Sequence, residues 1–141
     1  MDRRAILGEE GDPPSGPNAR PRLLFVDDEV YLAHLGEAML AKLGYEVSAY
    51  SEPQQALEAF LADPHAFAGL ITDLNMPGTS GTDLAERMRR VRPDLPVILA
   101  TGFGGPLELS RATPGDFLHI LEKPYDLEKL REIVGRVMPG A

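Results

Sequence analysis

The chain contains no cysteine, so a disulfide framework and a thiolate metal site are both excluded. No apolar run approaches the roughly 20 residues that span a membrane. The N-terminal region also lacks the continuous apolar core of a signal peptide. From these absences we expect a cytoplasmic protein that does not insert into a membrane.

Basic residues are in the minority as well. The 141 residues include 14 Lys and Arg against 22 Asp and Glu, which gives a net charge of −8. A nucleic-acid-binding surface needs a clustered basic face, so we expect no direct contact with nucleic acid. Much of the acidic excess is typical of a solvated surface that aids solubility. Several acidic groups could instead gather around a divalent cation.

The residues that are present suffice for one globular domain. Hydrophobic residues make up 43% of the chain and aromatic residues 6%, and a chain of this length can bury a sizeable core. Residues 1–20 are the exception, because residues 12–18 are rich in Pro, Gly and Ser and have nothing to bury. We expect a disordered or weakly ordered tail over residues 1–20 and a single domain over residues 21–141.

Short apolar runs alternate along this domain with segments of helical periodicity. The runs predict strands at residues 23–26, 46–50, 68–73, 97–100 and 117–121, and the second is polar enough to lie at a sheet edge. The intervening segments predict five helices, of which the fourth, at about residues 107–112, is short and bounded by Pro and Gly. This alternation indicates right-handed crossovers and a parallel sheet covered by helices on both faces.

Particular residues mark the ends and inner faces of these helices. Ser51, Ser80 and Asp126 are expected to cap three helix N-termini, and Gly44 is a natural helix stop. The arginines at positions 87, 89, 90 and 92 are expected to form a solvated face of the third helix. The expected apolar stripes are Leu35, Met39 and Leu43 in the first helix, Leu84, Met88 and Val91 in the third, and Leu127, Leu130, Val134 and Val137 in the last.

Polar side chains stand where four of the five predicted strands end: Asp27 and Asp28, Asp73, Thr101, and Lys123. In a doubly wound sheet these ends lie on one edge, where ligands bind. On its own, Asp73 could simply cap a turn. Carboxylates gathered in one crevice repel one another unless a cation is present, and hard oxygen ligands suit Mg²⁺. A carboxylate nucleophile, a metal and an ammonium together fit phosphoryl transfer.

Four stretches resemble the signatures of response-regulator receiver domains of two-component signal transduction. They are LLFVDDE at residues 23–29, ITDLNMPGTSG at 71–81, VILATG at 97–102 and LEKPY at 121–125. They occur in the family's order and at family-like spacing, and the resemblance covers about residues 22–138. It implies a flavodoxin-like, doubly wound five-stranded parallel sheet of order 2-1-3-4-5 with five helices, the fourth short or irregular.

The resemblance also implies roles for individual residues. Asp73 resembles the phosphoacceptor. Asp28 and Asp73 resemble direct Mg²⁺ ligands, with the main-chain oxygen of Asn75 as the third, while Asp27 would act through water. Thr101 resembles the hydroxyl that moves to a phosphoryl oxygen.

Lys123 would contact the phosphoryl group from the side opposite Thr101, and the Lys123–Pro124 bond is expected to be cis. The family often has Tyr or Phe three residues before this lysine, where Ile120 stands here. We therefore expect the conformational response to phosphorylation in residues 102–116, whose glycines lower the barrier to backbone rearrangement.

The implied function is a phosphorylation-controlled signalling switch rather than an enzyme acting on other substrates. It would take a phosphoryl group from a sensor histidine kinase or histidine phosphotransfer protein in a Mg²⁺-dependent reaction, and then lose it to water. We expect a downstream protein partner and a monomer or weak dimer. The TGF run at residues 101–103 resembles receivers attached to hybrid histidine kinases.

Two alternatives use the same fold features. The first is a phosphorylation-independent interaction module, against which the complete set of acidic residues, Thr101 and Lys123 argues. The second is a phosphatase of the haloacid-dehalogenase kind, which also uses an aspartate at a strand end. That class needs a second aspartate two residues after the nucleophile, where Asn75 stands here, and no cap domain is evident.

Overall fold

The computed structural model describes residues 21–102 and 119–138. The predicted tail, the predicted short helix at 107–112 and nearly all of the predicted switch segment lie outside these ranges. Among the described residues, no helix combines the length and apolar character needed to cross a membrane. In chain order the elements are β2 (Arg22–Val26), α1 (Val30–Lys42), β3 (Glu46–Tyr50), α2 (Pro53–Ala62), η1 (Pro64–Ala66), β4 (Gly69–Asp73), α3 (Gly81–Val91), β5 (Val97–Thr101), β6 (Ile120–Glu122) and α5 (Leu127–Val137).

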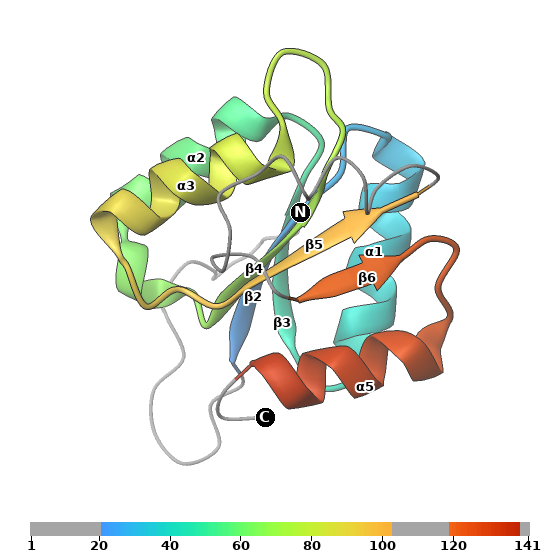
Figure 1. The fold of residues 1–141 in the computed structure, drawn as a ribbon. Helices are drawn as coiled ribbons and strands as arrows, with labels where there is room; N and C mark the ends of the chain where they lie inside the picture. The colour runs from blue at the N-terminus through green and yellow to red at the C-terminus, as the bar shows by residue number, and fades with distance from the viewer. Residues whose placement is uncertain (1–20, 103–118, 139–141) are drawn as a thin grey trace.

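The strands form one parallel sheet in the order β3-β2-β4-β5-β6. Numbered along the chain, this is the predicted order 2-1-3-4-5 of a flavodoxin-like fold, and the polar strand β3 lies at an edge as expected. Helices α2 and α3 cover one face of the sheet, and α1 and α5 cover the other (Figure 1). Because the strands are parallel, all their carboxyl ends meet at the same edge.

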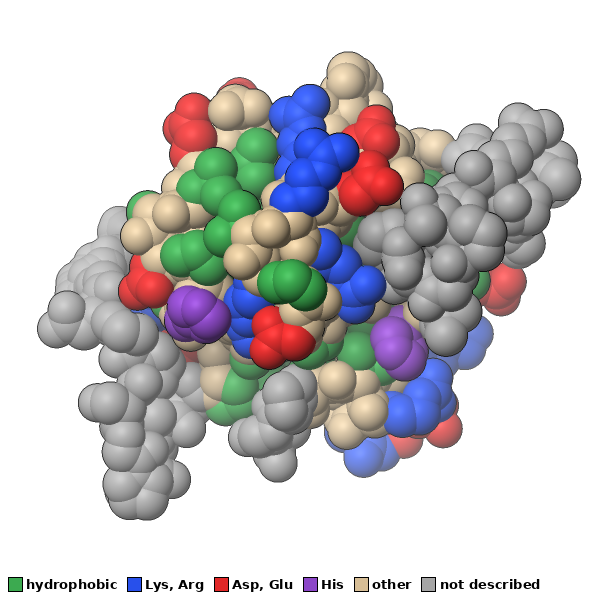
Figure 2. All heavy atoms as spheres, turned by 60° about the vertical axis from the view of Figure 1, so that its left-hand side comes forward, with side chains coloured by type: hydrophobic (Ala, Val, Ile, Leu, Met, Phe, Trp, Pro, Cys, Tyr) green, Lys and Arg blue, Asp and Glu red, His purple; other side chains and the backbone are tan. Residues whose placement is uncertain are grey.

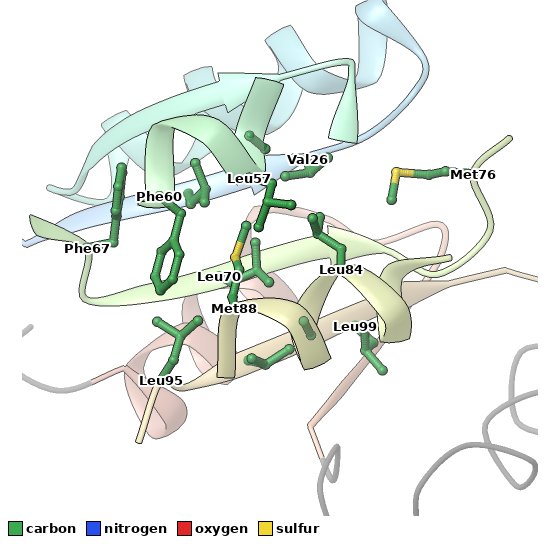
Figure 3. Packing of buried hydrophobic residues seen from close by; sticks show 14 of the residues in the cluster. Val26, Leu57, Phe60, Phe67, Leu70, Met76, Leu84, Met88, Leu95 and Leu99 are labelled. Atoms are coloured by element: carbon green, nitrogen blue, oxygen red, sulfur yellow. The ribbon is translucent and has the colours of Figure 1, made fainter. Parts of the chain in front are cut away.

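Each face of the sheet has its own apolar core, since side chains alternate along a strand. Leu24 and Val26 of β2 point to the α2 and α3 side, whereas Leu23 and Phe25 point to the α1 and α5 side. Figure 3 shows the first core, where side chains from α2, β4 and α3 meet around Phe60. Complete burial of a side chain of this size contributes about 1.5–3 kcal/mol. These two cores fix the sheet that carries the strand ends.

Two of the three predicted caps are confirmed. The Ser80 hydroxyl accepts a hydrogen bond from the Asp83 amide at 3.1 Å, and the Asp126 carboxylate accepts one from the Lys129 amide at 2.8 Å. The prediction for Ser51 is wrong, because α2 is preceded by Glu52 and has no side-chain cap. A proline near the start of that helix supplies helical φ and lacks an N–H that would need a partner.

The predicted inner faces of α1 and α3 are partly wrong. Leu35 is 43% exposed and Val91 is 52% exposed. Helix α1 instead buries Ala33, Gly36 and Leu40. A Cβ on Gly36 would lie 2.3 Å from the ring of Phe25, so at this position the helix lies too close to the sheet for a larger side chain. In α5, Ile133 is buried together with two of the predicted residues, Leu130 and Val134.

Strand β6 is shifted from its predicted position. It covers Ile120–Glu122 rather than residues 117–121, and residues 117 and 118 lie outside the described ranges. Its three residues pair with Leu99 to Thr101 of β5. The shift brings the end of β6 directly to Lys123.

The outer surface of α2 and α3 is mixed in charge, with basic, acidic and apolar side chains interleaved (Figure 2). Arg87 and Arg90 are exposed on it, as predicted for a solvated face. Arg92 differs, because its side chain is only 14% exposed. Its guanidinium donates to the carbonyl oxygens of Pro64, at 3.0 Å, and Phe67. Arg92 therefore ties the end of α3 to the segment that precedes β4.

Candidate functional site

Three carboxylates meet at the carboxyl ends of two neighbouring strands. Asp27 and Asp28 follow β2 directly, and Asp73 is the last residue of β4. Because β2 pairs with β4, these ends lie side by side. One carboxylate oxygen from each residue lies within 4.8 Å of the others, close enough to share a metal ion. The predicted gathering of these three side chains is confirmed.

Lys123 reaches this acidic cluster from the far side of β5. Its ammonium lies 2.9 Å from Asp73 Oδ1 and 3.1 Å from Asp27 Oδ2. Its backbone is fixed by a hydrogen bond from its amide to the carbonyl oxygen of Thr101, at 2.8 Å. The Lys123–Pro124 peptide bond is cis, as predicted. The structure thus brings the predicted ammonium onto the predicted carboxylates.

Burial and charge act together on the ionisation of the site. Burial raises the pKa of Asp73, and the charges of Asp27 and Asp28 add to this, while Lys123 opposes it. Burial alone would lower the pKa of Lys123, but its hydrogen bonds to Asp73 and Asp27 outweigh that effect and raise it. Lys123 is therefore held in its charged form. Among the residues that the structure describes, three carboxylates still face one ammonium, so the cluster keeps a negative excess.

The carboxylates differ in how they are held. Asp27 is nearly enclosed, with a side chain 3% exposed, and both its oxygens are engaged: Oδ1 accepts from the Glu29 amide at 3.0 Å, and Oδ2 contacts Lys123. Asp73 is 12% exposed. Asp28 is partly buried and makes no hydrogen bond or ion pair with any described residue. A ligand entering the site can therefore reach Asp28 and Asp73 more readily than Asp27.

The backbone next to Asp73 is held from several directions. The Thr72 hydroxyl donates to the Asp73 carbonyl oxygen at 3.1 Å, and the Leu74 amide donates to the Ala100 carbonyl at 2.8 Å. The Gly81 amide donates to the Leu74 carbonyl, also at 2.8 Å. Sequence reasoning assigned no role to Thr72 or Gly81. The only signal was a glycine directly after a capping serine, which does not reveal what the glycine touches.

Two predicted site residues lie nearby without a direct link to the cluster. Thr101 ends β5 and is 1% exposed, and within the described ranges its hydroxyl makes only a long bond, 3.5 Å, to the Gly102 carbonyl. Among the described residues, no hydrogen bond joins this hydroxyl to Asp73 or Lys123. Asn75 is exposed in the loop after β4. The roles of Thr101 and Asn75 therefore stay predictions.

A cavity of about 400 Å³ lies beside the acidic cluster, between α1 and the segment that joins β6 to α5. Its walls are mostly apolar, and burial raises the pKa of the Tyr125 phenol. The first two residues of α1, Val30 and Tyr31, are exposed, at 56% and 73%. The cavity is lined by Asp27, Leu32, Leu35, Lys123, Pro124 and Tyr125.

The family model described as "Response regulator receiver domain" matches residues 23–135. The chain belongs to this family. The response regulator receiver protein CpdR of Brucella abortus is 30% identical over 121 residues, which cover 85% of this chain and 98% of that protein. The response regulator PilR of Pseudomonas aeruginosa is 29% identical over 85% of this chain but only 26% of its own length. This receiver domain spans about a quarter of the length of the first curated relatives it matches.

Solved structures agree with this assignment. The response regulator protein TrrA of Thermotoga maritima, solved in complex with Mg²⁺ and BeF, superimposes with a TM-score of 0.72 at 28% identity. The match covers 82% of this chain and 97% of that one. The protein is thus a receiver domain of two-component signal transduction, and phosphorylation-dependent signalling fits its family and its site. Nothing found favours the phosphorylation-independent alternative.

Proposed function

We propose that Asp73 of this receiver domain is the phosphoacceptor, taking its phosphoryl group from a phosphohistidine on a sensor histidine kinase or a histidine phosphotransfer protein. The observation that carries the proposal is the convergence of Asp27, Asp28 and Asp73 within 4.8 Å, with the Lys123 ammonium 2.9 Å from Asp73. A carboxylate nucleophile beside an ammonium and further oxygen ligands supports phosphoryl transfer.

Exposure favours Asp73 over Asp27 as the nucleophile. Asp73 is 12% exposed and Asp27 only 3%, and both Asp27 oxygens are already engaged. In the transfer, an Asp73 oxygen attacks phosphorus while the bond between phosphorus and the donor imidazole nitrogen breaks. Lys123 offsets the negative charge that spreads over the phosphoryl oxygens. Attack of water on the phosphorus later returns Asp73 to a free carboxylate and releases inorganic phosphate.

The donor set fits Mg²⁺, which prefers oxygen ligands and keeps several waters. In this proposal Asp28, Asp73 and the Asn75 main-chain oxygen are direct ligands. Asp27 acts through water, because its oxygens are held by Glu29 and Lys123. When bound, Mg²⁺ would neutralise charge on the phosphoryl oxygens.

Thr101 supplies the remaining contact of the proposed site. It is buried at the end of β5, and within the described part of the chain its hydroxyl has only a weak bond to the following carbonyl. A buried hydroxyl without a good partner gains by finding one. We assign it to a phosphoryl oxygen on the side opposite Lys123.

Incubation with acetyl phosphate and Mg²⁺ tests the acceptor. The wild-type chain should gain about 80 Da by mass spectrometry, the mass of one phosphoryl group. Asp73→Asn should gain none, because an amide is a poor nucleophile. Asp63 is an exposed aspartate at the end of α2, so the control variant Asp63→Asn should react like wild type. An adduct that forms equally fast in Asp73→Asn would show that Asp73 is not the acceptor. A wild-type chain that gains no mass would favour the phosphorylation-independent module.

A further inference from the structure

The glycine at the start of α3 lies against the backbone of the proposed phosphoacceptor. Gly81 is buried, and a Cβ built on it would lie 2.3 Å from the Asp73 carbonyl oxygen and 3.1 Å from the Leu74 Cα. A carbon–oxygen separation of 2.3 Å is far inside van der Waals contact. Both neighbouring atoms belong to the backbone, so no side-chain rotation could relieve the overlap.

The peptide that follows Asp73 has little freedom to move away. Its carbonyl oxygen accepts from the Thr72 hydroxyl, and its amide, which belongs to Leu74, donates to Ala100 of the adjacent strand β5. The next carbonyl accepts from the Gly81 amide itself. Any displacement that made room for a side chain at position 81 would disturb these bonds.

Helix α3 cannot readily retreat either. Leu84, Ala85 and Met88 are buried against the sheet, and all three are at most 1% exposed. At its other end, Arg92 donates to carbonyl oxygens of Pro64 and Phe67, just before β4 begins. The helix is thus attached to the chain at both ends of β4. Strain introduced at Gly81 would fall mainly on the Asp73–Leu74 backbone.

We propose that Gly81 is a positioning residue for phosphoryl transfer. The absence of a side chain lets α3 lie directly on the Asp73 carbonyl, and this contact sets where the Asp73 carboxylate stands relative to Asp28 and Lys123. The same contact fixes the start of the loop that carries Asn75. This inference rests on the proposed role of Asp73. A misplacement of about 1 Å in a reacting group can lower a rate about 100-fold.

Gly81→Ala tests the inference, with Gly69→Ala as the matched control. Gly69 starts the same strand β4 at the end remote from the site, and a Cβ there would lie 2.1 Å from the Met138 sulfur, on a side chain that can move. Mg²⁺ affinity is measured by calorimetric titration and phosphorylation by mass spectrometry with acetyl phosphate. Both measurements are made well below the melting temperature of each variant.

We expect Gly81→Ala to weaken Mg²⁺ binding and to slow phosphorylation, each by about tenfold or more. Gly69→Ala should lower the melting temperature but stay within about twofold of wild type in both site measurements, because distant sites that share no partner act independently. A purely structural role for Gly81 would change the melting temperature without moving the Mg²⁺ affinity of the folded protein. If Gly81→Ala and Gly69→Ala had equal Mg²⁺ affinities and equal phosphorylation rates, the inference would be overturned.

Thr72→Val decides the question if Gly81→Ala does not fold. It removes the hydroxyl bonded to the same Asp73 carbonyl and adds almost no volume. Loss of this bond should weaken Mg²⁺ binding and slow phosphorylation, but by less than the effect expected for Gly81→Ala. Unchanged Mg²⁺ affinity and phosphorylation rate in folded Thr72→Val would reject the positioning role proposed for the contact between Gly81 and the Asp73 carbonyl. A wild-type chain that neither binds Mg²⁺ nor gains the adduct would instead refute the proposed role of Asp73.

Discussion

Lys123 shows how a single side chain offsets part of the negative charge of the site. Its ammonium contacts Asp27, which follows β2, and Asp73, which ends β4. Lys123 itself follows a third strand, β6. Burial raises the pKa of Asp73, and repulsion from the neighbouring carboxylates of Asp27 and Asp28 adds to this increase. One ammonium cannot neutralise three carboxylates, so a divalent cation that enters meets negative charge that the described residues leave unbalanced.

The different surroundings of Asp28 and Asp27 lead to a testable difference in metal binding. Asp28→Ala removes a proposed direct ligand and should weaken Mg²⁺ binding about tenfold or more, which corresponds to about 1.4 kcal/mol. Asp27→Ala should weaken it less, since Asp27 is proposed to act through water. Calorimetric titration of both variants measures this. Unchanged Mg²⁺ affinity in Asp28→Ala would remove Asp28 from the ligand set.

The raised pKa of Asp73 predicts a specific pH dependence of stability in the absence of metal. Its unperturbed pKa is 3.8, and burial raises it in the folded protein. Such a group contributes stability below the unfolded pKa and loses it as the pH rises through the folded pKa. The free energy of unfolding of wild type, relative to Asp73→Asn, should therefore fall as the pH rises from about 3 to 7. Urea denaturation in EDTA measures the difference, and a constant difference would contradict the prediction.

Helix ends provide a test at the scale of single elements. Asp126→Ala removes the carboxylate that accepts from the Lys129 amide, and should lower the free energy of unfolding by about 1 kcal/mol. Ser51→Ala should change it by less than about 0.5 kcal/mol, because α2 has no side-chain cap. Urea denaturation of both variants measures the two changes. A loss for Ser51→Ala as large as that for Asp126→Ala would mean that Ser51 stabilises α2 after all.

The elements also show what the sequence could and could not predict. Strand ends were predictable, because an apolar run that stops at Asp27 or Asp73 marks both the strand and its polar end. The inner face of α1 was not. Spacing alone favours Leu35, but the close approach of the helix to Phe25 selects the small Gly36 instead. That approach depends on how the helix packs on the sheet, which no local pattern records.

Contacts between segments that are distant in the sequence could not be predicted either. The bonds from Arg92 to the carbonyl oxygens of Pro64 and Phe67 depend on where η1 lies after folding. The contact of Gly81 with Asp73 depends on the path of the loop between them. In the sequence, Arg92 resembles any solvated arginine and Gly81 resembles any loop glycine. Sequence reasoning therefore found the residues with distinctive chemistry and missed those that only hold them in place.

At the scale of the whole molecule, the site belongs to no single segment. The sheet order places β4 between β2 and β5, so the strand that carries Asp73 has a partner on each side. One partner supplies Asp27 and Asp28, and the other ends in Thr101. Lys123 arrives from beyond β5. The relative positions of all these groups are thus set by the pairing of four strands and by the two cores that hold the helices on the sheet.

This sheet order also governs when the site comes into being on a nascent chain, which leaves the ribosome from its N-terminus. Strand β3 emerges before β4, but the edge of β2 with which it pairs adds nothing to the acidic cluster. Asp27 and Asp28 acquire their third carboxylate only when β4 docks on the opposite edge of β2. The ammonium follows last, once β6 has paired with β5. Translation therefore produces the three carboxylates of the site before Lys123, which offsets part of their charge.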